Sequence, residues 1–360
     1  MLNLDDQSVY ASLDKSGMGP QIRGLPGQCR RAWDRASLLK LPADYSQVDK
    51  VVILGLGGSA IGGDLLRGLT SSLSRPLVMV QREYNLPAWV DEKTLVIGAS
   101  YSGNTEETLS AFSQALKINC KKLVVSTGGR LTELARQNSV PVFVIEHVSP
   151  PRAALGYSLL PLLAIMQNLG FLSGEAAEVD GMVSALETMC RSWQEDSPQD
   201  HNQAKTLAAR LYGKIVVIYG AGILTDVARR WKTQINENSK QWAFFETLPE
   251  LNHNAVLGYR YPTGSSGLVY VLFLRCQSLH PRTLIRYNIT GELLEKSGIP
   301  YQYLDSQDSQ DSQGSSGLKH VMDLLLLGDW VSYYLAMLNG IDPSPVPEID
   351  LLKKRLAEGK

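Results

Sequence analysis

The sequence lacks an excess of charge of either sign. Lysine and arginine total 35 and aspartate and glutamate total 36 among 360 residues, which gives a net charge of −1. Proteins that bind nucleic acids or lie on anionic membranes need a basic surplus to neutralise phosphate groups. The balance argues against both kinds of partner, so any phosphate that the protein recognises is expected to be a small one held in a pocket.

Cysteine is scarce as well. The chain has four cysteines, none in a CxxC pair, at Cys29, Cys120, Cys190 and Cys276. This spacing predicts neither a zinc site nor a disulfide framework and indicates free thiols in a reducing compartment. The acidic segment 1–10 has neither the basic nor the apolar region of a signal peptide. We therefore expect a cytoplasmic protein.

Long hydrophobic runs without charge are also missing. The longest apolar stretch, 321–338, contains Asp323 and Asp329, so we predict a core helix there and not a membrane span. Hydrophobic residues make up 44% of the chain and charged residues 20%. A chain of this length and composition can form two domains with complete cores.

Apolar runs typical of buried parallel strands alternate with helical patterns along the chain. In the first half these runs lie at 50–54, 76–80, 94–98, 123–129 and 140–145. A polar stretch at 192–203, which we interpret as a linker, interrupts the pattern, and three further runs follow at 214–222, 267–274 and 299–304. Each half opens with a strand that ends in a Gly-x-Gly turn. The sequence thus predicts two α/β modules, each a parallel sheet with helices on both faces.

A loop dense in hydroxyl groups follows the predicted strand at 94–98. Residues 99–108 read ASYSGNTEET, and the apolar spacing after them is that of a helix. The loop lies between the carboxyl end of a strand and a helix N-terminus, where open α/β sheets bind ligands and free N–H groups favour an anion. A plain helix cap needs one hydroxyl, whereas this loop offers Ser100, Ser102 and Thr105. We therefore favour a phosphate cradle over a simple cap.

The first glycine-rich loop permits a second interpretation. Gly55, Gly57 and Ala60 fit the G-x-G-x-x-A fingerprint of dinucleotide-binding folds, and Glu83 lies past the next strand, where a ribose-binding acid is expected. That interpretation leaves the serine loop without a role and does not use Ser59. A phosphorylated sugar would use both loops, because both follow strands at one edge of the sheet.

Two polar clusters in the second half contain side chains suited to acid–base chemistry. Glu237 lies between two asparagines near the end of a predicted helix. It is either a solvated acid or a general base held by its amide neighbours. His253 also lies between two asparagines, and it is either a surface histidine or a group that moves a proton on a sugar ring oxygen. Glu250 and His253 could instead share a metal, although no third histidine lies near them.

Taken in order, these motifs resemble one family along nearly the whole chain. They are Gly-Gly-Ser at 57–59, the serine loop at 100–105, Pro-Arg-Ala-Ala at 151–154, Asn-Glu-Asn at 236–238 and Asn-His-Asn at 252–254. The pattern is similar to that of the bifunctional phosphoglucose/phosphomannose isomerase family, which is built from two sugar-isomerase (SIS) domains. The serine loop alone is typical of the domain, and its combination with the two asparagine clusters indicates the isomerase.

The resemblance implies a role for each candidate residue. The substrate phosphate would be held by Ser59, Ser100, Ser102 and Thr105, with Gly57 and Gly58 allowing the backbone to approach the sugar. Arg152 would stabilise the charge of an enediolate, Glu237 would move the proton between C1 and C2, and His253 of the partner subunit in a homodimer would open the ring. Near the C-terminus, Lys353 or its neighbour Lys354 matches an active-site lysine of the family, and Ser344 a small hydroxyl residue.

The implied reaction interconverts glucose 6-phosphate or mannose 6-phosphate with fructose 6-phosphate through a cis-enediol, without a cofactor or a metal. Because C2 becomes planar in the enediol, one base can serve both epimers. Two alternatives remain open. A non-catalytic SIS sensor would bind a sugar phosphate without needing Glu237 or His253, and an NAD-dependent oxidoreductase would bind a dinucleotide.

The pattern along the chain, together with the resemblance, predicts a domain organisation. A lead-in segment at 1–32, with turns at 16–20 and 25–27, would precede a first SIS domain at 33–190. A second SIS domain would occupy 195–340, and a tail helix within 341–360 would contribute to the active site. The Asp-Ser-Gln repeat at 305–313 has no core-forming residues, so we expect an exposed flexible loop without chemistry.

Overall fold

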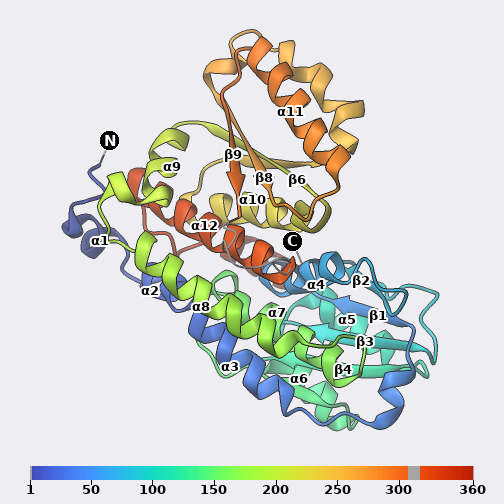
Figure 1. Cartoon of the computed structure of the whole chain (residues 1–360). Helices are drawn as coiled ribbons and strands as arrows, with labels where there is room; N and C mark the ends of the chain where they lie inside the picture. Colours follow the sequence, from blue (N-terminus) through green and yellow to red (C-terminus); the bar gives the residue numbers. More distant parts are fainter. Residues whose placement is uncertain (1, 307–316, 360) are drawn as a thin grey trace.

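The computed structural model of the chain describes residues 2–306 and 317–359, and its two halves each contain one parallel β-sheet (Figure 1). The first sheet has the strand order β2-β1-β3-β4-β5 and the second the order β7-β6-β8-β9. Every paired strand within them is parallel. The predicted α/β class with two parallel sheets is therefore confirmed.

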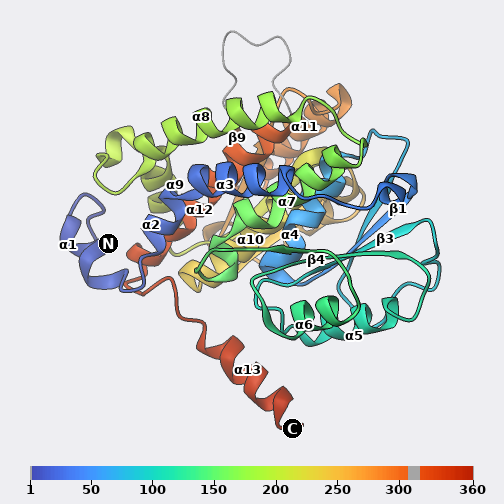
Figure 2. The same ribbon diagram turned by 90° about the horizontal axis from the view of Figure 1, so that it is seen from below.

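The first sheet comprises β1 (Lys50–Leu54), β2 (Leu77–Gln81), β3 (Thr94–Ala99), β4 (Lys121–Ser126) and β5 (Val142–Val144). Helices cover both faces of this sheet, as Figure 2 shows. Alternate side chains of β1 therefore belong to two separate hydrophobic cores, one on each face. Val51 and Ile53 pack towards α4 and α7, whereas Val52 and Leu54 pack towards α5 and α6. Burial on both faces explains why these strands are continuous apolar runs in the sequence. The helices are α4 (Gly57–Leu69), α5 (Glu106–Ala115), α6 (Gly129–Gln137) and α7 (Leu155–Asn168).

The second sheet comprises β6 (Ile215–Ala221), β7 (Ala243–Leu248), β8 (Val269–Arg275) and β9 (Tyr301–Asp305). α10 (Thr225–Ser239) connects β6 to β7, and α11 (Pro281–Lys296) connects β8 to β9. β7 was not predicted from the sequence. It is an edge strand in which Phe244 and Glu246 are exposed while the terminal residues Ala243 and Leu248 are buried, so it has no continuous apolar run.

The longest helix, α12 (Gly317–Leu338), packs against α10, α9 (Gln203–Leu211) and α8 (Glu175–Trp193) and runs between the two halves (Figure 1). Among the described residues it is the one helix with the length and composition to cross a membrane, but its apolar window is completely buried inside the protein. The prediction of a core helix at this place is confirmed. The predicted linker at 192–203 joins α8 to α9.

The N-terminal segment forms α1 (Gln7–Leu13), α2 (Met18–Arg23) and α3 (Leu25–Ser37). The turn expected at 25–27 is wrong, because these residues begin α3. Pro26 lies in the first turn of that helix, where its missing N–H is not needed for an intrahelical hydrogen bond. The Tyr333 hydroxyl of α12 donates to Asp14 at 3.2 Å, so the beginning of the chain is held by an element near its end.

The remaining elements are short or terminal. They are the 3-10 helices η1 (Ala43–Gln47), η2 (Pro151–Ala153), η3 (Gln199–His201), η4 (Gly222–Leu224), η5 (Glu250–His253), η6 (Ala255–Arg260) and η7 (Ser265–Gly267), and the helix α13 (Pro347–Ala357). Of the predicted Asp-Ser-Gln loop, Asp305 ends β9, and the part from residue 307 onwards lies outside the described residues. The expected domain boundaries stay a prediction.

Candidate functional site

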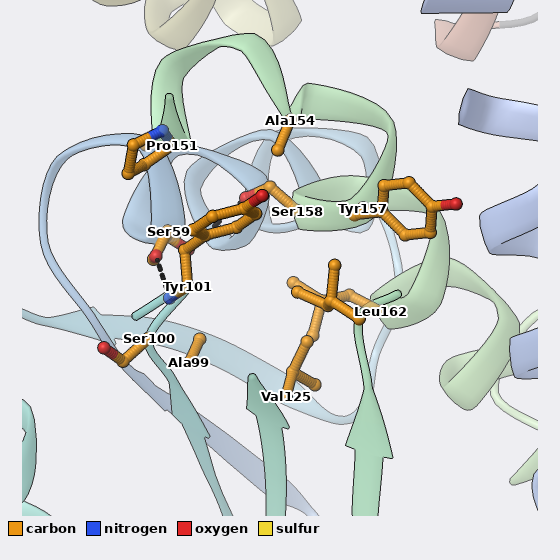
Figure 3. A pocket seen from close by; sticks show the side chains of 12 residues that line it. Ser59, Ala99, Ser100, Tyr101, Val125, Pro151, Ala154, Tyr157, Ser158 and Leu162 are labelled. Carbon is orange, nitrogen blue, oxygen red and sulfur yellow. Dashed lines mark hydrogen bonds between the residues drawn. The ribbon is translucent and has the colours of Figure 1, made fainter. Parts of the chain in front are cut away.

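Two loops meet at the carboxyl edge of the first sheet. β1 is followed by α4, which begins at Gly57 and contains Ser59 in its first turn, and β3 is followed by the serine loop at 100–105. β1 and β3 are neighbours in the sheet. The Tyr101 backbone N–H donates to Ser59 Oγ at 2.9 Å, which ties the two loops together (Figure 3). The prediction that both loops share one edge is confirmed.

The serine loop arranges its hydroxyls around a helix N-terminus. Ser100 Oγ lies 2.9 Å from Thr105 Oγ1 and accepts from the Gly103 N–H at 3.1 Å, and Ser102 Oγ accepts from the Asn104 N–H at 3.3 Å. Thr105 is the N-cap residue of α5 but makes no side-chain capping bond. The N–H groups of the first turn of α5 are therefore available to an anion.

The conformation of this loop depends on a glycine. Gly103 has φ +67°, and a Cβ built on it would lie 1.8 Å from the carbonyl oxygen of Gly128. The Leu131 N–H donates to the Gly103 carbonyl at 2.9 Å. The loop thus packs directly against the backbone that follows β4, and no side chain fits between them.

A small cavity lies behind the two loops. Its volume is about 20 Å³, which is room for about one water molecule. Figure 3 shows Val125 below the level of the Ser59–Tyr101 hydrogen bond, and Leu162 and Tyr157 to the right of that bond. A hexose phosphate is far larger than this space, so the cavity in this conformation does not enclose one. Tyr101 and Tyr157 line it and were not singled out from the sequence, because an aromatic residue in a loop or helix carries no periodic signal.

Arg152 and Glu237 bring the two halves of the chain together. Arg152 lies in η2, and its side chain is 5% exposed, whereas Glu237 lies in the last turn of α10 and its side chain is 30% exposed. Arg152 Nη1 is 3.6 Å from Glu237 Oε2. Burial lowers the pKa of the Arg152 guanidinium, and the negative charge of Glu237 partly opposes that effect. The pair is thus a buried cation beside a carboxylate that solvent can reach.

The other donors of Arg152 are fixed by the protein. Nε donates to Asn238 Oδ1 at 2.7 Å, and Nη2 donates to the carbonyl oxygens of Pro343 and Ser344, both at 2.8 Å. Asn238 in turn donates to Ser332 Oγ in α12 at 2.9 Å. The guanidinium is therefore held in one orientation, with Nη1 directed at Glu237.

A second ion pair supports the backbone of Arg152. Arg230 Nη2 donates to the Arg152 carbonyl at 2.9 Å and lies 3.0 Å from Asp329 Oδ2, and both side chains are buried. Gln234 Nε2 also donates to Asp329, at 2.9 Å. Arg230 and Asp329 were not predicted as site residues from the sequence, because the two side chains are 99 residues apart and no local spacing connects them.

Within the described chain, no hydrogen bond or ion pair connects His253 or Lys353 to the Arg152–Glu237 pair. His253 is exposed at the end of η5, and no hydrogen bond or ion pair connects its side chain to the rest of the described chain. Lys353 and Lys354 belong to α13, which has no buried residue and extends away from the body in Figure 2. The Ser344 carbonyl contacts Arg152, while its buried Oγ has no partner among the described residues.

The two alternative sites have little structural support. In the described ranges no three histidine, cysteine, aspartate or glutamate side chains converge as metal ligands would. The glycine at position 55 of the dinucleotide-like motif is explained by packing alone, because a Cβ there would lie 2.8 Å from the Ala99 carbonyl oxygen of the neighbouring strand.

The known proteins that resemble this chain in sequence have consistent names. The family model of the bacterial phospho-glucose isomerase C-terminal SIS domain matches residues 200–356. A bifunctional phosphoglucose/phosphomannose isomerase of Caldicellulosiruptor bescii is 41% identical, over 95% of this chain and 100% of the relative. A protein of the same name from Aquifex aeolicus is 34% identical, over 87% of this chain and 92% of the relative.

Solved structures with low sequence identity share the fold. A hypothetical protein from Thermus thermophilus superposes with a TM-score of 0.72 at 18% identity, covering 98% of this chain and 92% of the other. A putative phosphosugar isomerase from Clostridium difficile 630 gives 0.68 at 14% identity, covering 91% and 95%. These likenesses agree with the arrangement of two SIS-type parallel sheets.

Proposed function

Because the chain belongs to the bifunctional phosphoglucose/phosphomannose isomerase family, and is thus an isomerase, we propose that it interconverts glucose 6-phosphate and mannose 6-phosphate with fructose 6-phosphate at the Arg152–Glu237 pair. The observation that carries the proposal is this pair, a fixed buried cation 3.6 Å from a solvent-accessible carboxylate between the two halves of the chain. Neither group needs a metal or a cofactor for the chemistry proposed.

The phosphate of the substrate would bind the serine loop. Ser59, Ser100, Ser102 and Thr105 offer hydroxyl groups, and the first turn of α5 offers backbone N–H groups. The small cavity behind the loops has no room for the sugar, so we propose that the substrate lies on their outer side, next to Gly57 and Gly58. A Cβ on Gly57 would meet no atom within 4 Å, so a ligand can approach the backbone there, whereas a Cβ on Gly58 would lie 2.8 Å from the Pro151 carbonyl oxygen.

Glu237 would transfer the proton. Its carboxylate takes the proton from C2 of the open-chain aldose while O1 gains a proton, which gives the cis-enediol. The carboxylic acid then returns a proton to C1 as O2 loses one, which gives the ketose. Arg152 would stabilise the negative charge that develops on the oxygens of the substrate. Because its other donors are already hydrogen-bonded to the protein, the guanidinium does not have to reorient during the reaction.

Ring opening requires a second acid–base group. We propose that His253 of the partner subunit fills this role in a homodimer, which its exposure and its lack of side-chain bonds within the described chain support. Lys353 on the exposed α13 is proposed to join the same site. We also propose a cytoplasmic location, because buried cysteines that form no disulfide with one another are typical of a reducing compartment.

The Glu237→Gln variant tests the proposal. After treatment with EDTA, the wild-type protein should convert both aldoses separately, and the variant should lose about a hundredfold to ten-thousandfold in kcat, the usual share of a general base. Calorimetry should still detect binding of the sugar phosphate, because the amide keeps the shape of the side chain. The control Glu295→Gln, an exposed carboxyl on α11, should leave turnover unchanged.

Near-normal turnover by Glu237→Gln would exclude it as the base. Binding without turnover by the wild-type protein would favour the sensor, and binding of NAD would favour the oxidoreductase.

The partner's histidine can be tested by mixing two inactive variants. Glu237→Gln and His253→Ala, dissociated together and reassociated in equal amounts, should form mixed dimers that contain one intact site. Statistical mixing in a twofold-symmetric dimer predicts a recovery of about a quarter of the wild-type activity. If the mixture stays inactive, His253 does not act across the interface.

A further inference from the structure

The residue that follows α10 has an unusual backbone conformation. Lys240 has φ 54° and ψ 19°, which is the left-handed region, and among the described non-glycine residues only Ser139 shares a positive φ. Glycine commonly occupies this position after a helix, because a Cβ is unfavourable there. The contacts of the lysine side chain can offset the cost of this backbone conformation.

These contacts are to carbonyl oxygens on two separate segments. Lys240 Nζ donates to the Glu237 carbonyl at 2.8 Å and to the Pro343 carbonyl at 2.9 Å. Longer contacts of 3.4 Å reach the carbonyls of Asn238 and Asp342. A cation at this place is favoured, since the last carbonyls of a helix are unpaired and carry the negative end of its dipole.

Each of the two segments holds one of the proposed reacting groups. The first segment contains Glu237, the proposed base, whose carbonyl accepts from Lys240. The second contains the Pro343 carbonyl, which also accepts a hydrogen bond from Arg152 Nη2 at 2.8 Å. Lys240 thus bridges the last turn of α10 to the backbone that orients the guanidinium. The ammonium does this entirely through main-chain atoms and leaves the Glu237 carboxylate free for the substrate.

We propose that Lys240 is a positioning residue of the isomerase site, which fixes the separation and relative orientation of Arg152 and Glu237. The inference rests on the proposed function of that pair. Lys240 does not contact the reacting atoms in this role, so its loss should lower kcat much more than it changes KM, since the sugar phosphate is bound mainly at the serine loop.

Three substitutions separate the bridge from ordinary folding. Lys240→Met keeps most of the length of the side chain and removes the donors, and Lys240→Gly also removes the cost of the left-handed backbone conformation. We expect both to lose about tenfold to a hundredfold in kcat, the cost of displacing a reacting group by about 1 Å. The glycine variant should be as thermostable as the wild type or more so, and Lys240→Arg should recover most of the lost rate.

Ser139→Gly is the matched control, because it relieves the same backbone conformation at a site in the first half. Its kcat should equal that of the wild type.

Hydrogen exchange measures the bridge without turnover. In Lys240→Met, the amides of Asp342, Ser344 and Val346 should exchange faster than in the wild type. If Lys240→Gly keeps the wild-type kcat and this exchange is unchanged in Lys240→Met, the inference is wrong while the isomerase activity stands. If the wild type converts neither sugar, the proposed function fails instead, and unchanged exchange would still contradict the bridge.

Discussion

At the scale of single residues, the site depends on the shape of Arg152 as well as on its charge. The guanidinium contacts Glu237 through Nη1 and Asn238 through Nε, and its Nη2 donates to the carbonyls of both Pro343 and Ser344. A planar group with five donors can satisfy this set of acceptors, whereas an ammonium with three donors on a flexible stem cannot reach them together. Arginine and lysine are therefore not equivalent at this position.

The Arg152→Lys variant should lose both activity and stability. We expect kcat to fall by about a hundredfold to a thousandfold, as when one oxyanion donor is removed. The free energy of unfolding should fall by about 1–3 kcal/mol, because buried acceptors lose their donors. Steady-state kinetics and urea denaturation measure the two effects.

Arg136→Lys on the exposed face of α6 is the control for that change, and it should alter neither quantity. A kcat within about twofold of the wild type in Arg152→Lys would mean that charge alone is needed, which is the behaviour of a point cation.

At the scale of elements, the position of Ser59 depends on how closely α4 approaches α7. A Cβ at Gly62 of α4 would lie 2.1 Å from the Ser158 carbonyl oxygen of α7, and the Gly62 N–H donates to Ser158 Oγ at 3.2 Å. Two helix backbones in contact at this distance leave no space for a side chain. The close contact with α7 therefore fixes the position of α4, whose first turn contains Ser59.

Gly62→Ala should therefore destabilise the protein by about 1–3 kcal/mol, the usual cost of overpacking. Gly68→Ala in the same helix is its matched control, because a Cβ there would meet its nearest atom at 3.8 Å. That change should be neutral or should stabilise by up to about 1 kcal/mol, since alanine favours a helix over glycine. Equal effects of the two changes on urea denaturation would show that α4 and α7 can separate without cost.

Some elements of the fold can be predicted from the sequence and others cannot. The buried strands of the first sheet were found because both of their faces are apolar, and the serine loop was found because it follows such a strand. β7 was missed because its exposed Phe244 and Glu246 interrupt the pattern. The contacts that hold Arg152 were missed for another reason. Asn238 and Ser332 are 94 residues apart, and no local spacing predicts a contact over that distance.

At the scale of the whole molecule, all four cysteines are buried and no disulfide joins any two of them, as the sequence predicts. Burial raises the pKa of the Cys29 and Cys190 thiols from their ordinary value of 9.0 to about 12. It also raises the pKa of the buried tyrosines Tyr219 and Tyr287. The folded protein thus keeps protons that the unfolded chain loses in alkaline solution.

This difference makes the stability depend on pH with a definite sign. The folded pKa values are raised, so the stabilising effect is complete below pH 9.0 and is lost as the pH rises towards 12. We expect the free energy of unfolding to fall by on the order of a few kcal/mol between about pH 9 and pH 11. Urea denaturation at several pH values measures the fall.

A thiol reagent at about pH 8, where an exposed cysteine is partly ionised, should modify no cysteine until the protein is unfolded. Replacing Cys29 and Cys190 with alanine should reduce the alkaline loss of stability. An unchanged loss would assign it to the tyrosines.

The position of α12 in the chain also has a consequence for synthesis. The ring of Tyr10 stacks on that of Tyr333 with centroids 6.0 Å apart, so α1 packs against a helix that is synthesised much later. At about 5–20 residues per second, the nascent N-terminal helices wait many seconds for that partner. During this interval their apolar faces are open to chaperones and proteases, and translation that stops before residue 317 leaves a chain whose two halves share no core helix.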